Sequence, residues 1–189
     1  LFVPGEADAN FTLELLSSNG RFIPTGFNER KLVSGKVVEL KLKPEVAKGA
    51  FAIKLTSDQP LLAAIRSRAT SNGNSDFVWI TPSPALAPLQ IAIGGILPKI
   101  IFAGDAIAIN LRVEFSNGKF KEQSITGSDL VNWQVPNNAI AITVLSAGVD
   151  TYAGALIAAK SGYAFFPIAS GAELTKVAIP SSNIRVLNP

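Results

Sequence analysis

The stretch Asn10-Phe-Thr-Leu-Glu-Leu-Leu-Ser-Ser-Asn-Gly-Arg-Phe22 recurs later in the chain as Ala108-Ile-Asn-Leu-Arg-Val-Glu-Phe-Ser-Asn-Gly-Lys-Phe120. In both copies an alternating apolar run ends in Ser-Asn-Gly, a basic residue and Phe. The copies are 98 residues apart, since 117 minus 19 gives 98 for the two Asn positions, and this is about the length of one small β-sandwich domain. The repeat therefore predicts that the chain contains an internal duplication.

Short alternating runs indicate that both halves are built from β-strands. Because successive side chains of a strand point to opposite faces, a period of two predicts a strand with one buried face. No segment shows a helical period over about eleven residues, and the one candidate for a helical turn is Pro44 to Gly49. The chain is therefore predicted to be all-β. The inward-facing residues of its predicted strands include Phe11, Leu13 and Leu15; Val38, Leu40 and Leu42; Phe51, Ile53 and Leu55; and Ile107, Ile109, Leu111, Val113 and Phe115.

The order of turns and strands predicts two tandem immunoglobulin-like antiparallel β-sandwich domains. Asn19-Gly20 and Asn117-Gly118 are each expected to form a tight hairpin turn, because Asn and Gly tolerate positive φ. The segment Pro82-Ser-Pro-Ala-Leu-Ala-Pro88 lacks alternation, as a semi-rigid linker does. The predicted division is 1–88 for the first repeat, 89–98 for a linker and 99–189 for the second repeat. Two further pairs of segments align loosely, 57–67 with 160–170 and 77–83 with 176–182.

Composition excludes several kinds of chemistry. The chain has no Cys and no His, which removes disulfides, thiolate zinc sites, thiol nucleophiles and the commonest general base. Its net charge of +3 comes from 17 basic and 14 acidic residues. The basic residues are scattered apart from Arg66-Ser-Arg68 and Lys119/Lys121, so the sequence predicts no nucleic-acid partner. Because the chain has no Met, Leu1 is expected to follow a processed or missing segment.

No membrane-spanning helix is expected within this chain. Such a helix needs about 20 predominantly apolar residues. The most apolar stretch, 89–109, is interrupted by Gly94-Gly95, Pro98, Lys99 and Asp105.

The polar residues give no catalytic or metal-binding pattern. A cation site without His or Cys needs clustered oxygen ligands, and the closest acidic pair, Glu6 and Asp8, keeps only one acid at the matching Gly104-Asp105. Ser161 follows Lys160, and neighbours on a strand point to opposite faces. Asp58, before Gln-Pro, is expected to be a turn residue that accepts backbone N–H bonds. We therefore predict no enzyme, no catalytic, cofactor-binding or metal-binding residue, and no cofactor.

Aromatic residues are the remaining candidates for a binding function. Carbohydrate-binding modules on sandwich folds stack sugars on exposed Trp and Tyr side chains. Trp79 shares its parity with Phe77 in an apolar run, and Trp133 shares its parity with two Val residues, so both Trp side chains are predicted to lie in the core. Tyr152 and Tyr163 are the remaining Trp or Tyr residues of the chain. A carbohydrate-binding module would show at least two of these four side chains exposed on one face or in one loop cluster, and burial of all four would exclude it.

Several segments resemble a known group of proteins. They are Leu1-Phe-Val-Pro-Gly-Glu6, Phe11-Thr-Leu-Glu-Leu-Leu16, Asn19-Gly-Arg-Phe-Ile-Pro-Thr-Gly26, Val33-Ser-Gly-Lys-Val-Val38 and Thr56-Ser-Asp-Gln-Pro60. They are similar to an uncharacterised secreted protein family of actinobacteria, a domain of unknown function. The resemblance extends over nearly the whole chain, to Val177-Ala-Ile-Pro-Ser-Ser182. It implies export to the cell envelope and a position near the C-terminus of a longer precursor, and it brings no functional residues.

Together these features predict a non-catalytic function. The first expectation is an exported scaffold or protein-interaction module of a longer cell-envelope protein. The alternative is a module that binds a carbohydrate or envelope polymer through exposed aromatic residues. The partner would be an envelope protein or polysaccharide, and any membrane attachment would come from parts of the precursor outside this chain. Assembly of copies through edge strands is a further possibility, and it predicts a long edge with few Lys or Pro.

Overall fold

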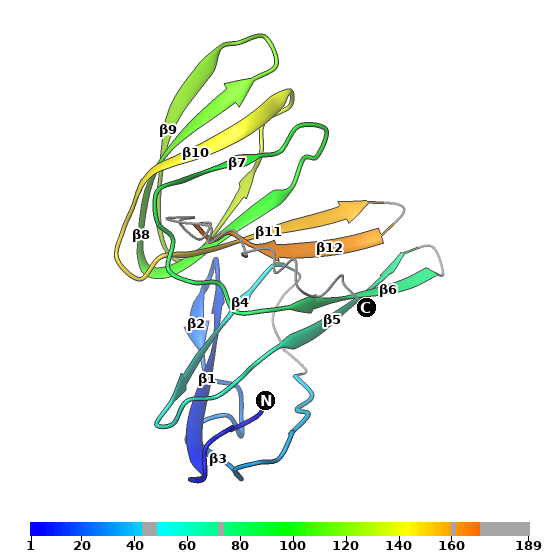
Figure 1. Ribbon diagram of the computed structural model, residues 1–189, viewed down its shortest axis with the longest axis vertical. Coiled ribbons are helices and arrows are strands. Elements are labelled where there is room, and N and C mark those ends of the chain that lie inside the picture. Colours follow the sequence, from blue (N-terminus) through cyan, green and yellow to red (C-terminus); the bar gives the residue numbers. More distant parts are fainter. Residues whose placement is uncertain (43–48, 72–73, 160–161, 171–189) are drawn as a thin grey trace, which may run out of the picture.

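The computed structural model of the protein describes residues 1–42, 49–71, 74–159 and 162–170. Over these residues the chain is all-β, with no helix, which confirms the predicted fold class. The strands form antiparallel sheets of four, six and two strands (Figure 1). The finer prediction of two immunoglobulin-like sandwiches is not confirmed. The predictions for residues 44–48, for Lys160 and Ser161, and for the closing segment 176–182 lie outside the described residues.

The four-stranded sheet is built around the first copy of the repeated stretch. Strand β1 (Ala9–Ser17) pairs on one side with β2 (Gly20–Phe22) and β3 (Arg30–Leu32), and on the other with β4 (Ala52–Ser57). The predicted alternation of β1 is confirmed, because its odd-numbered apolar side chains are buried. They form a small core with residues of the N-terminal segment and of β3: Val3, Ala9, Phe11, Leu13, Leu15, Phe27 and Leu32.

One predicted strand of this half is absent as a ladder strand. Residues 38–42 form no ladder strand; an isolated bridge joins Phe2 to Val37, and Val38 exchanges two backbone hydrogen bonds with Leu1, each of 2.9 Å. The alternation is nevertheless real, because Val38, Leu40 and Leu42 pack against the small core. An extended segment can bury alternate side chains with backbone pairing at one end only, and the sequence pattern does not distinguish such a segment from a ladder strand.

The six-stranded sheet is built around the second copy. The two longest strands, β8 and β9, form a hairpin, and β8 also pairs with β10 and β11. The buried face of the sheet encloses the larger core, which includes Phe102, Leu111 and Trp133. The strands are β7 (Leu89–Ala92), β8 (Lys99–Phe115), β9 (Phe120–Gln134), β10 (Ala139–Ala147), β11 (Tyr152–Ala159) and β12 (Gly162–Pro167).

A register shift divides β8 into two parts. Before it the even-numbered Ile100 and Phe102 are buried, and after it the odd-numbered Ile107 and Ile109 are buried. The shift lies between Gly104 and Ile107, as in a β-bulge. A bulge changes which parity faces the core and bends the strand. One part of β8 therefore pairs with β11 and the other with β10, both beside β9 (Figure 1).

The predicted linker contains a strand. Residues 89–92 form β7, which pairs with β10 at the edge of the six-stranded sheet. Leu86, just before it, lies in the larger core, and its N–H donates to the carbonyl of Thr151 at 2.7 Å. The apolar residues after Pro88 thus belong to the second half structurally, and the division of the chain into 1–88, 89–98 and 99–189 stays a prediction.

A third, two-stranded sheet lies between these two parts of the chain. Strands β5 (Ile65–Ser71) and β6 (Asn74–Ile80) form an antiparallel ribbon. The ribbon lies beside β12 of the six-stranded sheet (Figure 1), and the N–H of Tyr163 donates to Asp76 Oδ2 at 2.9 Å.

Candidate functional site

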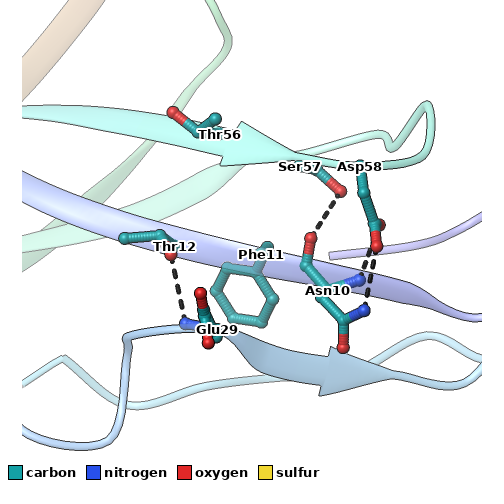
Figure 2. Close-up of a pocket in the computed structure, with 7 residues that line it drawn as sticks. All are labelled: Asn10, Phe11, Thr12, Glu29, Thr56, Ser57 and Asp58. Carbon is teal, nitrogen blue, oxygen red and sulfur yellow. Dashed lines mark hydrogen bonds between the residues drawn. The ribbon is translucent and has the colours of Figure 1, made fainter.

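A shallow hollow of about 500 Å³ lies on the polar side of β1. Figure 2 shows that β1 and the end of β4 contribute most of its lining, with Glu29 on the opposite side. The hollow is open, and its lining residues are Asn10, Phe11, Thr12, Glu29, Thr56, Ser57 and Asp58.

Asp58 in this hollow fastens the end of β4 to the start of β1. Its Oδ1 accepts the backbone N–H of Asn10 at 2.7 Å, and its Oδ2 accepts the Asn10 side-chain amide at 2.9 Å (Figure 2). These hydrogen bonds to Asn10, the backbone bond foremost, lower the pKa of Asp58 below its ordinary value of 3.8. The prediction that Asp58 accepts backbone N–H bonds is confirmed.

The hollow is also lined by a second carboxylate residue, Glu29, whose backbone is fixed by a hydrogen bond to Thr12. Its N–H donates to Thr12 Oγ1 at 3.1 Å, and its φ of 47° lies in the left-handed region. A general acid must hold a proton near the working pH, and Asp58 is held ionised with both oxygens accepting from Asn10. The arrangement is therefore suited to fixing the strand ends of this sheet.

A similar hollow of about 340 Å³ lies on the polar face of β8. There Ser124 Oγ donates to Asn110 Oδ1 at 2.7 Å, and Asn110 Nδ2 donates to Ser146 Oγ at 2.9 Å. These bonds tie β9, β8 and β10 together on the outer face. The two hollows occupy related places in the two copies, but the residues that line them differ.

Two of the acids weighed as cation ligands, Asp8 and Asp105, pair with cations of the protein itself. Asp8 Oδ1 accepts the backbone N–H of Ser34, and its Oδ2 lies 3.0 Å from Lys31 Nζ. The Ser34 bond, followed by Lys31, lowers the pKa of Asp8. Among the described residues no group of three or more acidic side chains is placed to hold a metal ion.

Asp105, the acid of the second copy, belongs to an ionic joint between the two halves. Arg21 Nη1 lies 2.8 Å from Asp105 Oδ1, and Arg21 Nε donates to Asp129 Oδ1 at 2.7 Å. Lys54 Nζ lies 3.6 Å from Asp105. The side-chain bond from Arg21 and the charge of Lys54 lower the pKa of Asp105. The joint links β2 and β4 of the small sheet to β8 and β9 of the large one.

The four Trp and Tyr side chains divide into buried and exposed ones. Trp133 is 9% exposed and packs on Phe102 with 6.5 Å between ring centroids, which confirms its predicted core position. The prediction for Trp79 was wrong, because its side chain is 56% exposed. Tyr152 is 38% exposed, and Tyr163 is half-buried. The two exposed members, Trp79 on β6 and Tyr152 on β11, lie in different sheets, so they do not form the expected pair on one sheet face.

The exposed Trp79 belongs to a surface that we call the Arg–aromatic strip. It consists of Arg66 and Arg68 on β5 and of Phe77 and Trp79 on β6. In the ribbon Arg66 is directly opposite Trp79, and Arg68 is directly opposite Phe77. All four side chains are exposed, and the Arg66 guanidinium lies 6.0 Å from the centroid of the Trp79 ring.

The sequence contained both parts of this strip, and Asn72-Gly73 between them is a hairpin signal that was missed. A two-residue turn at this position predicts that Arg66 is opposite Trp79. Arg66-Ser-Arg68 is a basic pair with a period of two, and Phe77-Val-Trp79 has the same period. The aromatic run was assigned to the core because Val78 and Ile80, on the other parity, are apolar as well. With apolar residues on both parities, alternation cannot say which face is buried.

The outer edge of β9 bears on the possibility of assembly through edge strands. Among the described residues β9 makes ladder pairs with β8 alone. Its 15 residues include one Lys, Lys121, and no Pro. The edge therefore has the composition that such assembly requires, and the assembly itself stays a prediction.

The fold and these surfaces define an all-β protein with shallow polar hollows and an exposed aromatic and basic face on the β5–β6 ribbon. The chain belongs to a family of unknown function, DUF5719, whose model matches residues 1–95. That match includes the small sheet, the β5–β6 ribbon and β7, and it ends before β8. No curated protein and no solved structure matches the chain. The described part of the chain contains no helix that could cross a membrane.

Proposed function

We propose that this chain is an exported, non-catalytic module of a longer actinobacterial cell-envelope protein. In this role it is a scaffold that holds a binding surface outside the cell. The observation that carries the proposal is the ionic joint of Arg21 with Asp105 and Asp129, which fastens the two sheets to each other. A module of linked sheets keeps a fixed spacing between the segments on either side of it. The occupied carboxylates Asp8, Asp58 and Asp105 support a structural use of its acidic residues.

The location is tested on intact cells of the source organism. An antibody raised against the 189-residue chain should label intact cells as strongly as permeabilised cells. Labelling that appears only after permeabilisation would contradict export. A cytoplasmic protein of the same cells provides the control, because it should be labelled only after permeabilisation.

The second candidate function is binding of an envelope carbohydrate. The observation that favours it is the Arg–aromatic strip, in which Trp79 and Phe77 are 56% and 53% exposed on one face of the ribbon. Exposed aromatic rings present wide apolar faces, which stack on the C–H faces of sugars. A glycan array probed with the wild-type chain and with Trp79→Ala tests this function. Signals that Trp79→Ala abolishes support it, and an array without any signal contradicts it.

A further inference from the structure

We propose that the Arg–aromatic strip binds an acidic polysaccharide, with the two guanidinium groups on its carboxylates and the two rings on its sugar faces. This inference rests on the carbohydrate-binding function above and adds the charge class of the ligand. It concerns Arg66, Arg68, Phe77 and Trp79, which the β5–β6 ribbon brings to one surface.

The register of the ribbon places these four residues on the same face. Residues directly opposite each other in an antiparallel pair project to the same side of the sheet, and so do residues two apart on one strand. Arg66 opposite Trp79 and Arg68 opposite Phe77 therefore form two adjacent Arg–aromatic pairs. Each strand places its two members about 7 Å apart, so the strip repeats the same pair of groups along its length.

The other face of the ribbon is turned toward the six-stranded sheet. Asp76 lies on that face by its parity, and its Oδ2 accepts the N–H of Tyr163 on β12 at 2.9 Å. Val78 and Ile80 have the same parity as Asp76, and both are half-buried. With one face occupied in this way, the aromatic residues of the opposite face are left to solvent. The only acid of the two described strands thus points away from the strip.

The groups on the strip match the groups along an acidic polysaccharide. Such a polymer alternates carboxylates with sugar rings, and an Arg guanidinium pairs with a carboxylate through two parallel N–H bonds. Arg66 keeps its side chain 53% exposed although one of its nitrogens lies 3.1 Å from Glu39. Because Glu39 accepts from one nitrogen of Arg66, Nη2, the other N–H groups of this guanidinium can meet a ligand. Arg68 adds a second cation on the same face.

A similar pair on the large sheet shows what a self-contained Arg–aromatic pair looks like. The Arg112 guanidinium lies 4.9 Å from the centroid of Phe120, a side chain that is 62% exposed. Two nitrogens of Arg112 also donate to Glu122 Oε1, at 3.2 and 2.8 Å. Glu122 therefore neutralises the charge of Arg112. Phe120→Ala is a matched control for the loss of an exposed aromatic ring.

The charge distribution favours a polysaccharide over a nucleic acid. Binding of nucleic acid draws most of its strength from many phosphate contacts, whereas this surface offers two cations and the whole chain carries +3. A sugar polymer needs fewer charges, because each ring adds an apolar contact. Single-stranded DNA has both anions and stacking faces, so it is included in the test as a competing ligand.

The test measures binding of the 189-residue chain to four probes by isothermal titration calorimetry at low salt. The probes are polygalacturonate, dextran, polyphosphate and oligo-dT. We expect polygalacturonate to bind most tightly and its affinity to fall as salt is raised, because exposed charges are screened beyond about 10 Å at 0.1 M salt. Trp79→Ala and Arg68→Ala should each weaken it about tenfold, which corresponds to 1.4 kcal/mol. Phe120→Ala and Lys119→Ala should leave it unchanged.

Each other outcome overturns a defined part of the proposal. If dextran binds as tightly as polygalacturonate and Trp79→Ala weakens both, the carbohydrate function stands and the acidic class is wrong. If polyphosphate binds equally well, charge alone explains the result, and if oligo-dT binds most tightly, the ligand is a nucleic acid. Equal losses in Arg68→Ala and Lys119→Ala would show a net-charge effect without a site. If no probe binds, both the function and the ligand class fail. Unchanged melting temperatures establish that the variants are folded.

Discussion

The two copies of the repeated stretch form the same strand but different surfaces. Strand β1 and the second part of β8 share their pattern of buried residues. Each is the first strand of a hairpin whose turn contains Asn-Gly. In the first hairpin Ser17 is opposite Gly20, whereas in the second Phe115 is opposite Lys119, and the Phe115 N–H donates to the Lys119 carbonyl at 2.9 Å. The second turn is therefore one residue longer.

That one residue places the basic side chains of the two copies on opposite faces. A shift of one residue in register exchanges the faces of a strand. Arg21 is opposite Leu16, on the side that meets the second half, and it reaches Asp105 and Asp129. Its counterpart Lys119 is opposite Phe115, on the core side of the large sheet. The two copies therefore share their core positions, while turn length determines which copy makes the joint.

The largest expected effects are losses of unfolding free energy when a core leucine is truncated, and they should differ between the two cores. Leu13 and Leu111 are equivalent positions, 98 residues apart, and both are buried. Leu111 lies between β9 and β10 in the larger core, where both neighbouring strands restrict relaxation around a cavity. We expect Leu111→Ala to lower the free energy of unfolding by about 4 kcal/mol and Leu13→Ala by about 2 to 3 kcal/mol. Urea unfolding measures both, and an equal or larger loss in Leu13→Ala would contradict the difference between the cores.

A smaller effect is expected at the joint. Arg21→Ala removes the cation that Asp105 and Asp129 share, and it leaves those carboxylates close to each other without Arg21 between them. Its melting temperature should fall, whereas Lys119→Ala at the equivalent sequence position should melt like the wild type. Differential scanning calorimetry compares the two variants. If both variants melt alike, Arg21 does not hold the halves together.

The smallest expected effect is the loss of folded-state stability at low pH. The pKa values of Asp8, Asp58 and Asp105 lie below the ordinary 3.8 because of their hydrogen bonds and cationic partners. A lowered pKa in the folded state contributes stability that is complete above 3.8 and is lost as the pH falls through the folded pKa. Two of these residues hold the small sheet and the third lies in the joint, so acid should weaken the small sheet first.

Hydrogen exchange measured at pH 5 and at pH 3 tests the acid prediction. Amides of β1, β3 and β4 should lose protection before those of β8 and β10. The variant Asp58→Asn, which cannot ionise, should show a smaller difference between the two pH values in β1 and β4. The prediction fails if the large sheet loses protection first.

The strand content and much of the core followed from the sequence, because alternation reports a half-buried strand directly. For Ile107 to Val113 the predicted inward parity is the observed one. The same strand continues back to Lys99, and this part was missed because the bulge after Gly104 changes the parity. A Cβ on Gly104 would lie 2.7 Å from the carbonyl oxygen of Asp150, so the close backbone approach there depends on a contact that is distant in sequence.

The exposure of the candidate binding surface could not be predicted for a related reason. Both parities of β6 are apolar, and the choice between them depends on β12, which is about 85 residues away and touches the face that carries Asp76. The pairing of Arg66 with Trp79 follows from the hairpin register, in which Ser71 is opposite Asn74. Asn72-Gly73 between these two residues is a hairpin signal that the sequence carries, and this signal was missed. Local patterns fixed the strands, and long-range contacts fixed which side chains are left exposed.

The most direct test of the proposed binding surface uses the two Trp residues of the chain. Trp79 is exposed on the strip and Trp133 is buried, so acrylamide should quench the fluorescence of Trp79 far more than that of Trp133. We predict that polygalacturonate protects Trp79 from quenching, that dextran protects it less, and that salt removes the protection by polygalacturonate. Quenching that is the same with and without polygalacturonate would contradict binding at the Arg–aromatic strip.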